Sequence, residues 1–179
     1  MSRVRIVGGQ WRSRLLDVAH VPGLRPTPDR VRETLFNWLG QDLTGLTCLD
    51  LFGGTGILGF EAASRGAERV VIVESDPRAH AALRQSVTAL SAMQVEVIRG
   101  DALRFVQTAT ERFDVVFLDP PYHKGWLERL EPWLGRLLKP DGWLYAEAET
   151  EVGELAGLST IKAGRAGLVH FHLLQGSQE

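Results

Sequence analysis

The chain has 179 residues, of which 44% are hydrophobic and 23% charged, and it carries one cysteine and a formal net charge of −2. This length fits one globular domain whose core needs no disulfide or structural metal, and the lone Cys48 excludes an internal disulfide. No uncharged run is long enough to span a bilayer and no secretory signal follows Met1, so we expect a cytoplasmic protein.

The charge is unevenly distributed along the chain. Residues 1–40 carry seven arginines and only three acidic residues, so the remaining residues hold the whole acidic excess. A basic arm on an acidic body suggests one face for an anionic polymer such as a nucleic acid. The alternative is an arginine-rich segment that is simply solvated.

The first expected element is a β-hairpin over residues 3–18. Arg3 and Arg5 alternate with Val4 and Ile6, which places the two residue types on opposite faces of a strand. Because two strands alone are marginal in water, this hairpin should pack on the main body or become ordered on a partner.

A proline-containing linker over residues 22–26 leads to the first expected helix. Thr27 is its expected N-cap, Pro28 its first residue, and Gly40 lies just past its end. The expected buried stripe of this helix consists of Val31, Leu35, Trp38 and Leu39.

From residue 47 onward, short apolar runs alternate with amphipathic helical patterns. This alternation is typical of a parallel sheet covered by helices on both faces. The last two strands are joined too closely for a crossover and should be antiparallel. The expected class is α/β: a doubly wound, seven-stranded, mostly parallel sheet with an antiparallel C-terminal strand and an N-terminal hairpin. The expected strands are residues 47–51, 70–74, 95–99, 114–119, 143–148, 158–162 and 168–174, and the expected helices are 57–65, 77–90, 102–108 and 126–138.

Ligands of such sheets bind beyond the carboxyl ends of the strands, so the residues there are the site candidates. Gly54, Gly56 and Gly59 form a G-x-G-x-x-G pattern after the first strand, which would bring bare backbone close to a ligand. Asp50 precedes this loop. A carboxylate there would repel a pyrophosphate but attract an ammonium group.

Two more carboxylates follow the next two strands. Glu74 lies about twenty residues after the glycine loop, where an acidic side chain can bind both hydroxyls of a ribose. Asp101 could meet an adenine edge together with Ala102, or it could be only a helix N-cap.

The fourth strand ends in Asp119, Pro120, Pro121 and Tyr122, the most specific signal in the chain. The prolines lack N–H donors and hold the backbone extended, which leaves the Pro120 carbonyl available as an acceptor. A carboxylate, a carbonyl and an aromatic ring together suit a flat molecule that carries an exocyclic amino group.

With these motifs the chain resembles the class I S-adenosylmethionine-dependent amino methyltransferases, and within them the RsmD family of bacterial 16S rRNA guanine-N2 methyltransferases. The resemblance covers nearly the whole chain and rests on Asp-Pro-Pro-Tyr and on the segments at residues 5–12, 24–39, 48–56 and 61–67. The chain departs from the family pattern at Gly54, where relatives usually carry Ala, and at Ser86, which replaces a common Asn.

The resemblance implies S-adenosylmethionine as cofactor, and 16S rRNA or the small ribosomal subunit as partner of a monomer that needs no membrane and no metal. Residues 1–22 would be an RNA-binding extension and residues 23–179 the methyltransferase domain. Asp119, Pro120, Pro121 and Tyr122 would be catalytic. The cofactor would be held by Asp50, Phe52, Gly53, Gly54, Thr55, Gly56, Glu74, Ser75, Asp101, Ala102 and Thr27. RNA would be held by Arg3, Arg5, Arg12, Arg14, Arg25 and Arg30.

Three alternatives stay open on the sequence alone. The glycine loop and Glu74 would also serve a nicotinamide-dependent oxidoreductase, although Asp50 and the double proline argue against it. An inactive RNA-binding module would keep the basic arm without the chemistry. The Asp-Pro-Pro-Tyr motif also serves adenine, cytosine and glutamine amines, so only the whole-chain resemblance selects guanine.

Overall fold

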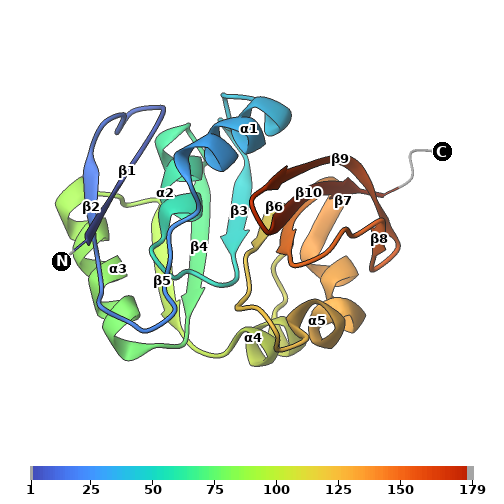
Figure 1. Cartoon of the computed structure of the whole chain (residues 1–179). Coiled ribbons are helices and arrows are strands. Elements are labelled where there is room, and N and C mark those ends of the chain that lie inside the picture. Colours follow the sequence, from blue (N-terminus) through green and yellow to red (C-terminus); the bar gives the residue numbers. More distant parts are fainter. Residues whose placement is uncertain (1, 177–179) are drawn as a thin grey trace.

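The computed structural model describes residues 2–176 and contains an eight-stranded sheet beside a two-stranded hairpin (Figure 1). The order in the sheet is β5-β4-β3-β6-β7-β10-β9-β8. The strands are β1 (Ser2–Arg5), β2 (Leu15–Val18), β3 (Thr47–Asp50), β4 (Arg69–Glu74), β5 (Val95–Arg99), β6 (Phe113–Leu118), β7 (Leu138–Ala148), β8 (Glu154–Leu155), β9 (Leu158–Ala166) and β10 (Val169–Gln175). The helices are α1 (Asp29–Leu39), α2 (Ile57–Ser64), α3 (Pro77–Leu90), α4 (Ala102–Thr108) and α5 (Trp126–Leu134), followed by the short 3-10 helix η1 (Gly135–Leu137).

The doubly wound, mostly parallel sheet is confirmed. Strands β5, β4, β3, β6 and β7 run parallel to one another, and β10 runs antiparallel to both β7 and β9. The order reverses between β3 and β6, and ligand crevices open at such a switch point. None of the helices in the described part of the chain has the length and apolar character that crossing a membrane requires.

The expected count of seven strands is wrong by one. The extra strand, β8, is formed by only two residues that pair with the start of β9, which is too short for any alternation to reveal it. Strand β7 also begins earlier than expected and includes Pro140–Gly142, and a register shift between Phe113 and Val115 of β6 accommodates the irregular stretch.

Two apolar cores lie on the two faces of the sheet. One contains buried side chains of the hairpin, α1, α2 and α3, such as Ile6, Leu35 and Phe60. The other contains side chains of α4, α5 and η1, such as Val106 and Leu130. The stripe expected over residues 126–138 therefore belongs to the second core, as its period indicates.

Helix α1 begins differently from the sequence expectation. Thr27 does not cap it: Pro28 occupies the N-cap position and no side chain bonds the first turn. The Thr27 hydroxyl instead donates a hydrogen bond to Asp119 Oδ2 at 3.2 Å. Gly40 ends the helix as expected. Its buried face consists of Val31, Arg32, Leu35 and Phe36, whereas the expected Trp38 and Leu39 are only partly buried.

The hairpin packs on the body of the protein, one of the two outcomes expected for it. Val4 and Ile6 are buried while Arg3 and Arg5 face solvent, as the alternation predicts. The loop between β1 and β2 is held by α2, because the Trp11 amide donates to Ser64 Oγ at 2.9 Å.

A buried ion pair joins the hairpin to α1 and α2. Arg32 is 0% exposed, and its Nε lies 3.5 Å from Oε1 of the equally buried Glu61. Arg32 also donates to the backbone carbonyls of Arg5 and Thr27, and Glu61 accepts the Val7 amide. This pair fixes the Thr27 backbone and so helps to aim the Thr27 hydroxyl at Asp119.

Candidate active site

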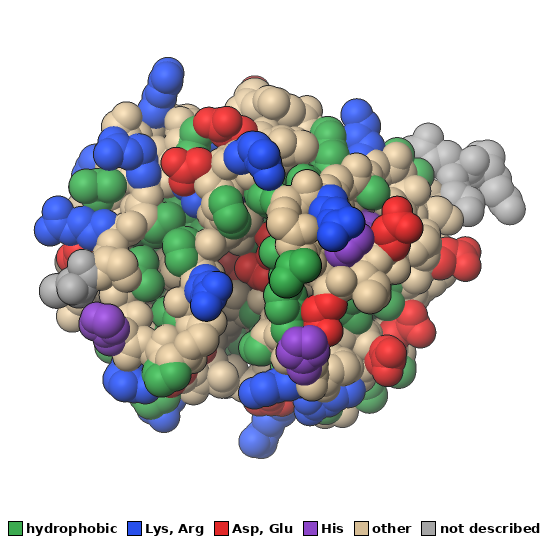
Figure 2. Space-filling view, viewed as in Figure 1, with side chains coloured by type: hydrophobic (Ala, Val, Ile, Leu, Met, Phe, Trp, Pro, Cys, Tyr) green, Lys and Arg blue, Asp and Glu red, His purple; other side chains and the backbone are tan. Residues whose placement is uncertain are grey.

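Three carboxylates converge at the carboxyl ends of adjacent strands. Asp50 is the last residue of β3, Asp119 follows β6, and Glu147 lies near the end of β7. Leu118 pairs with Ala146 across β6 and β7, so the next residues, Asp119 and Glu147, emerge side by side. Figure 2 shows a hollow near the middle of one face with acidic side chains inside it. No salt bridge neutralises these three groups within the described residues.

Asp50 is 1% exposed and incompletely hydrogen bonded. Its Oδ2 accepts the Gly59 amide at 3.2 Å, while its Oδ1 has no partner in the described chain. Burial, with the nearby charges of Glu74 and Glu147, raises the pKa of the Asp50 carboxyl well above its usual range. A buried acceptor without a partner is costly unless a ligand supplies the missing donor, and a cationic donor suits this place best.

Asp119 lies partly buried between Thr27 and Glu147. The Asp119 and Glu147 carboxyl groups follow register partners of β6 and β7, so they lie close enough for the charge of Glu147 to act on Asp119. Burial, followed by the charge of Glu147, raises the pKa of Asp119 well above its usual range. Asp119 therefore holds a proton more readily than an exposed aspartate does.

The double proline and Tyr122 complete the fourth strand's end. Within residues 2–176, no loop or cap amide donates to the Pro120 carbonyl, so it is available as an acceptor beside Asp119. Burial and the charges of Glu147 and Asp119 raise the pKa of Tyr122 to about 12. A carboxylate, a carbonyl and an aromatic ring thus follow one another directly after β6.

The glycine loop is tied to Glu74. The Gly54 amide donates to Glu74 Oε1 at 2.7 Å, and the Asp76 amide donates to Oε2 at 2.7 Å. Gly56 has φ +80° at the N-cap of α2, and a Cβ there would lie 2.4 Å from a Leu83 methyl carbon, so no other residue fits. Gly54 has φ +54°, and a Cβ there would lie 3.0 Å from a methyl carbon of Leu24 in the linker, so an alanine at this position would be strained.

A pocket of about 150 Å³ extends from this loop toward α4. Five of the expected cofactor residues line it: Phe52, Glu74, Ser75, Asp101 and Ala102. Asp101 also caps α4 by accepting the Arg104 amide at 3.1 Å, which confirms the N-cap reading, and its contact with an adenine edge stays a prediction. The other expected cofactor residues do not line this pocket: Asp50 ends β3, Thr27 precedes α1, and Gly53, Gly54, Thr55 and Gly56 form the adjoining loop.

The sequence reasoning missed three residues of this region. Trp126 lines the pocket, packs against Phe52 with ring centroids 5.1 Å apart, and leaves its buried Nε1–H without a partner in the described chain. Lys124 also lines the pocket. Glu147 is 5% exposed, and its signal was a charge within the otherwise apolar strand Tyr-Ala-Glu-Ala.

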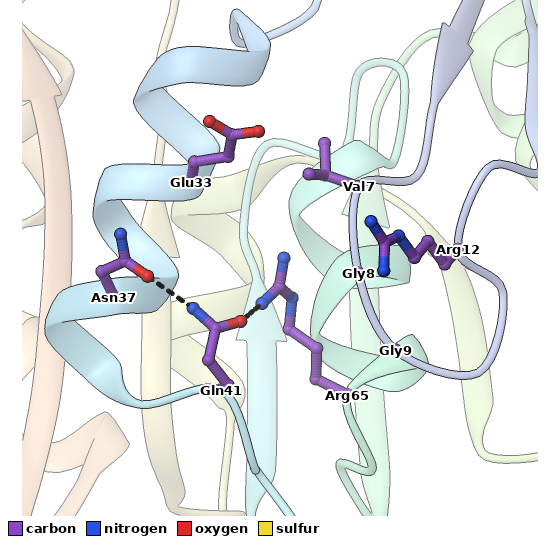
Figure 3. Close-up of a pocket in the computed structure, with 8 residues that line it drawn as sticks. All are labelled: Val7, Gly8, Gly9, Arg12, Glu33, Asn37, Gln41 and Arg65. Carbon is purple, nitrogen blue, oxygen red and sulfur yellow. Dashed lines mark hydrogen bonds between the residues drawn. The ribbon is translucent and has the colours of Figure 1, made fainter.

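A larger cavity of about 370 Å³ lies elsewhere, between the hairpin loop, α1 and the end of α2 (Figure 3). Its polar groups mostly bind one another: Arg65 donates to Gln41 and to Glu61, and Gln41 Nε2 donates to Asn37 Oδ1 at 2.6 Å. Figure 3 shows Arg12 entering from the hairpin loop, opposite Glu33 of α1. None of the residues at the carboxyl ends of the strands lines this cavity, so it is separate from the acidic centre.

The arginines expected to hold RNA lie on the surface. Arg3, Arg5, Arg12, Arg14, Arg25 and Arg30 are all exposed. Arg3 pairs with Asp17 at 3.1 Å, and Arg14 donates to the Ala89 carbonyl at 3.2 Å. Figure 2 shows basic side chains along the edge where Figure 1 places β1 and β2, and acidic ones toward β8. No His, Cys, Asp and Glu side chains form a metal-binding group within residues 2–176.

Comparisons with known proteins agree with this arrangement. A family model described as conserved hypothetical protein 95 matches residues 4–175. A relative from Escherichia coli, ribosomal RNA small subunit methyltransferase D, is 42% identical over 90% of this chain and 80% of its own length. The protein of the same name from Haemophilus influenzae is 41% identical over 96% of this chain and 93% of its own length. A solved structure of an Escherichia coli candidate methyltransferase, yhhF, superposes with a TM-score of 0.89 at 38% identity, covering 99% of this chain and 100% of that one.

Proposed function

The chain belongs to the RsmD family of ribosomal RNA small subunit methyltransferases, and from this we propose that it transfers a methyl group from S-adenosylmethionine to the exocyclic N2 amine of a guanine in 16S rRNA. The observation that carries the proposal is the arrangement at the switch point of the sheet. Asp50, a buried carboxylate without a partner for its Oδ1, ends β3. The neighbouring strand, β6, is followed directly by Asp119, the Pro120 carbonyl and Tyr122.

The residues of the site fit this cofactor. The unpartnered Asp50 Oδ1 suits the ammonium group of its methionine part, since a buried carboxylate seeks a cationic donor. Glu74 suits the ribose hydroxyls because each of its oxygens accepts one amide and keeps lone pairs for a ligand. The pocket that Asp101, Ala102 and Phe52 line suits the adenine. When bound, S-adenosylmethionine supplies a methyl group on a positively charged sulfur, an activated leaving group.

The chain's own residues then mainly align the amine with the methyl group and stabilise the charge that develops on its nitrogen. Asp119 and the Pro120 carbonyl accept the two hydrogens of the amine, which orients its nitrogen and stabilises the positive charge that develops there. Thr27 holds the other side of the Asp119 carboxylate at 3.2 Å. The raised pKa of Asp119 makes it a competent acceptor for the proton that the methylated amine releases.

The base must be unstacked to reach this centre, which is least costly in an RNA loop. Tyr122 replaces a stacking neighbour, a contact worth roughly 1 to 3 kcal/mol. The exposed arginines of residues 1–22 and of the linker contact the phosphates, so this segment acts as the RNA-binding extension of a methyltransferase domain over residues 23–179. The substrate is naked 16S rRNA or the small subunit, and the protein acts as a monomer.

Two measurements test the proposal. Isothermal titration should show binding of S-adenosylmethionine and none of NAD, which separates a methyltransferase from an oxidoreductase with the same glycine spacing. Asp119→Ala should lose turnover by orders of magnitude and keep its cofactor affinity, because Asp119 contacts the amine rather than the cofactor. A drop of only twofold in turnover would remove Asp119 from the mechanism.

A further inference from the structure

The residues of the Asp-Pro-Pro-Tyr motif recognise an amino group but do not choose its base. Asp119 and the Pro120 carbonyl are two acceptors for two N–H donors, and adenine, cytosine and guanine all carry such an amine. The selection of guanine therefore needs a further residue that reads the atom next to the amine. The need for such a residue rests on the proposed function.

Glu147 has the position and burial that such a residue requires. It emerges from β7 beside Asp119, since Leu118 and Ala146 are register partners. Only 5% of it is exposed, and the Tyr145 hydroxyl fixes it by donating to Oε1 at 2.6 Å. The register of β6 and β7 places the Glu147 carboxyl beside that of Asp119, and its charge raises the pKa of Asp119 and of Tyr122. A base stacked on Tyr122 with its amine at Asp119 would thus bring its adjacent ring atom to Glu147.

The ring atom next to the amine differs among the bases. In guanine, N1 carries a hydrogen and lies beside the N2 amine, so the edge presents two neighbouring kinds of donor. In adenine and cytosine, the ring nitrogen beside the amine is an acceptor. A carboxylate attracts the first arrangement and repels the second, so one residue supplies both a favourable contact and a penalty.

We propose that Glu147 is the specificity-determining residue of this site, whose carboxylate accepts the N1–H of the target guanine while Asp119 accepts the N2–H. The neighbouring acids suit this edge because two carboxylates side by side match two neighbouring donors. Tyr145 acts as a positioning residue, since its hydroxyl holds Glu147 Oε1 and turns the rest of the carboxylate toward Asp119. Neither residue lines the pocket formed by Phe52, Glu74 and Ala102.

The test uses 16S RNA assembled by ligation with either guanine or 2-aminopurine at the mapped target position. 2-Aminopurine keeps the 2-amino group, but its N1 is an acceptor rather than a donor. The ratio of kcat/KM for guanine to that for 2-aminopurine is measured for the wild type, for Glu147→Gln and for Glu68→Gln. Glu68 is an exposed residue just before the amino end of β4, whereas the candidate site lies at the carboxyl ends of the strands, and it serves as the matched control.

The wild type and Glu68→Gln should prefer guanine by about tenfold to a hundredfold, the loss expected when a hydrogen bond to a charged group is removed. In Glu147→Gln the ratio should fall to about threefold or less, because the amide that replaces the carboxylate can donate to N1 of 2-aminopurine. S-adenosylmethionine affinity should remain within about twofold of the wild type, which shows that the variant is folded.

Two results would overturn the inference. The first is a wild type that methylates 2-aminopurine as fast as guanine, a measurement that needs no variant to fold. The second is a Glu147→Gln enzyme that loses rate equally on both bases, since this would reduce Glu147 to a general support for Asp119. A wild type that methylates guanine neither in this RNA nor in small subunits assembled from it would instead refute the proposed function, so the two failures are distinguishable.

Discussion

Replacing Asp50 with asparagine should stabilise the ligand-free protein and weaken its binding of S-adenosylmethionine. Asp50 is 1% exposed, and its Oδ1 has no partner in the described chain, so the folded protein bears the cost of a buried, incompletely satisfied carboxylate. That cost is about 1 to 3 kcal/mol, and for a chain of this size it corresponds to an increase in Tm of roughly 2 to 12 °C. Cofactor binding loses a charge-assisted hydrogen bond, about 1.5 to 3 kcal/mol, or roughly a tenfold to hundredfold increase in Kd.

The gain in stability should depend on pH with a defined sign. The pKa of Asp50 is raised in the folded protein, so between its unfolded and folded values the folded state binds more protons and stability falls as pH rises. Asp50→Asn should therefore match the wild type below about pH 4 and exceed it increasingly above. Differential scanning calorimetry across this range, with Glu68→Gln as control, and isothermal titration provide both readouts. A lower Tm at pH 7 would refute the cost assigned to the buried Asp50 carboxylate. An unchanged Kd would refute the assignment of Asp50 to the ammonium group.

Three further changes test other parts of the molecule. Arg32→Ala leaves Glu61 buried with one cation fewer and should cost about 3 to 5 kcal/mol in the free energy of unfolding, measured with urea; a loss below 1 kcal/mol would contradict the role of the pair. Trp126→Phe removes an indole donor that lines the pocket without a partner and should raise the Kd for S-adenosylmethionine about twofold to tenfold in titration calorimetry; an unchanged Kd would exclude that contact. Deleting the hairpin would uncover the core, so the charge of the hairpin is better tested by the double substitution Arg3→Gln with Arg5→Gln. This change should lower the slope of log K for RNA binding against log salt by about 1.4 to 1.8 and leave cofactor affinity unchanged. An unchanged slope would remove both arginines from the RNA interface.

The strand ends could be read from the sequence because each apolar run stops at a polar residue. Asp50, Glu74 and Asp119 were placed correctly at one edge of the sheet, since parallel strands bring their carboxyl ends together. Glu74 and Asp101 line one pocket, as their equivalent positions after adjacent strands predict.

The errors arose where tertiary contacts override local preference. Threonine is a preferred N-cap residue, but Arg32 donates a hydrogen bond to the Thr27 carbonyl, and the Thr27 hydroxyl donates to Asp119 instead of capping the helix. Glu147 was missed because the functional meaning of a single charge in a buried strand depends on the register with the next strand. The burial of Arg32 was also hidden, because its partner Glu61 comes from another helix.

The most direct test of the account is methyl transfer from labelled S-adenosylmethionine to 16S rRNA and to small subunits from cells that lack the enzyme, followed by mapping of the modified nucleotide. The account predicts a single labelled guanine that carries its methyl group on N2, with at least one of the two substrates active. Label on another base, on another atom of guanine or on protein would contradict it.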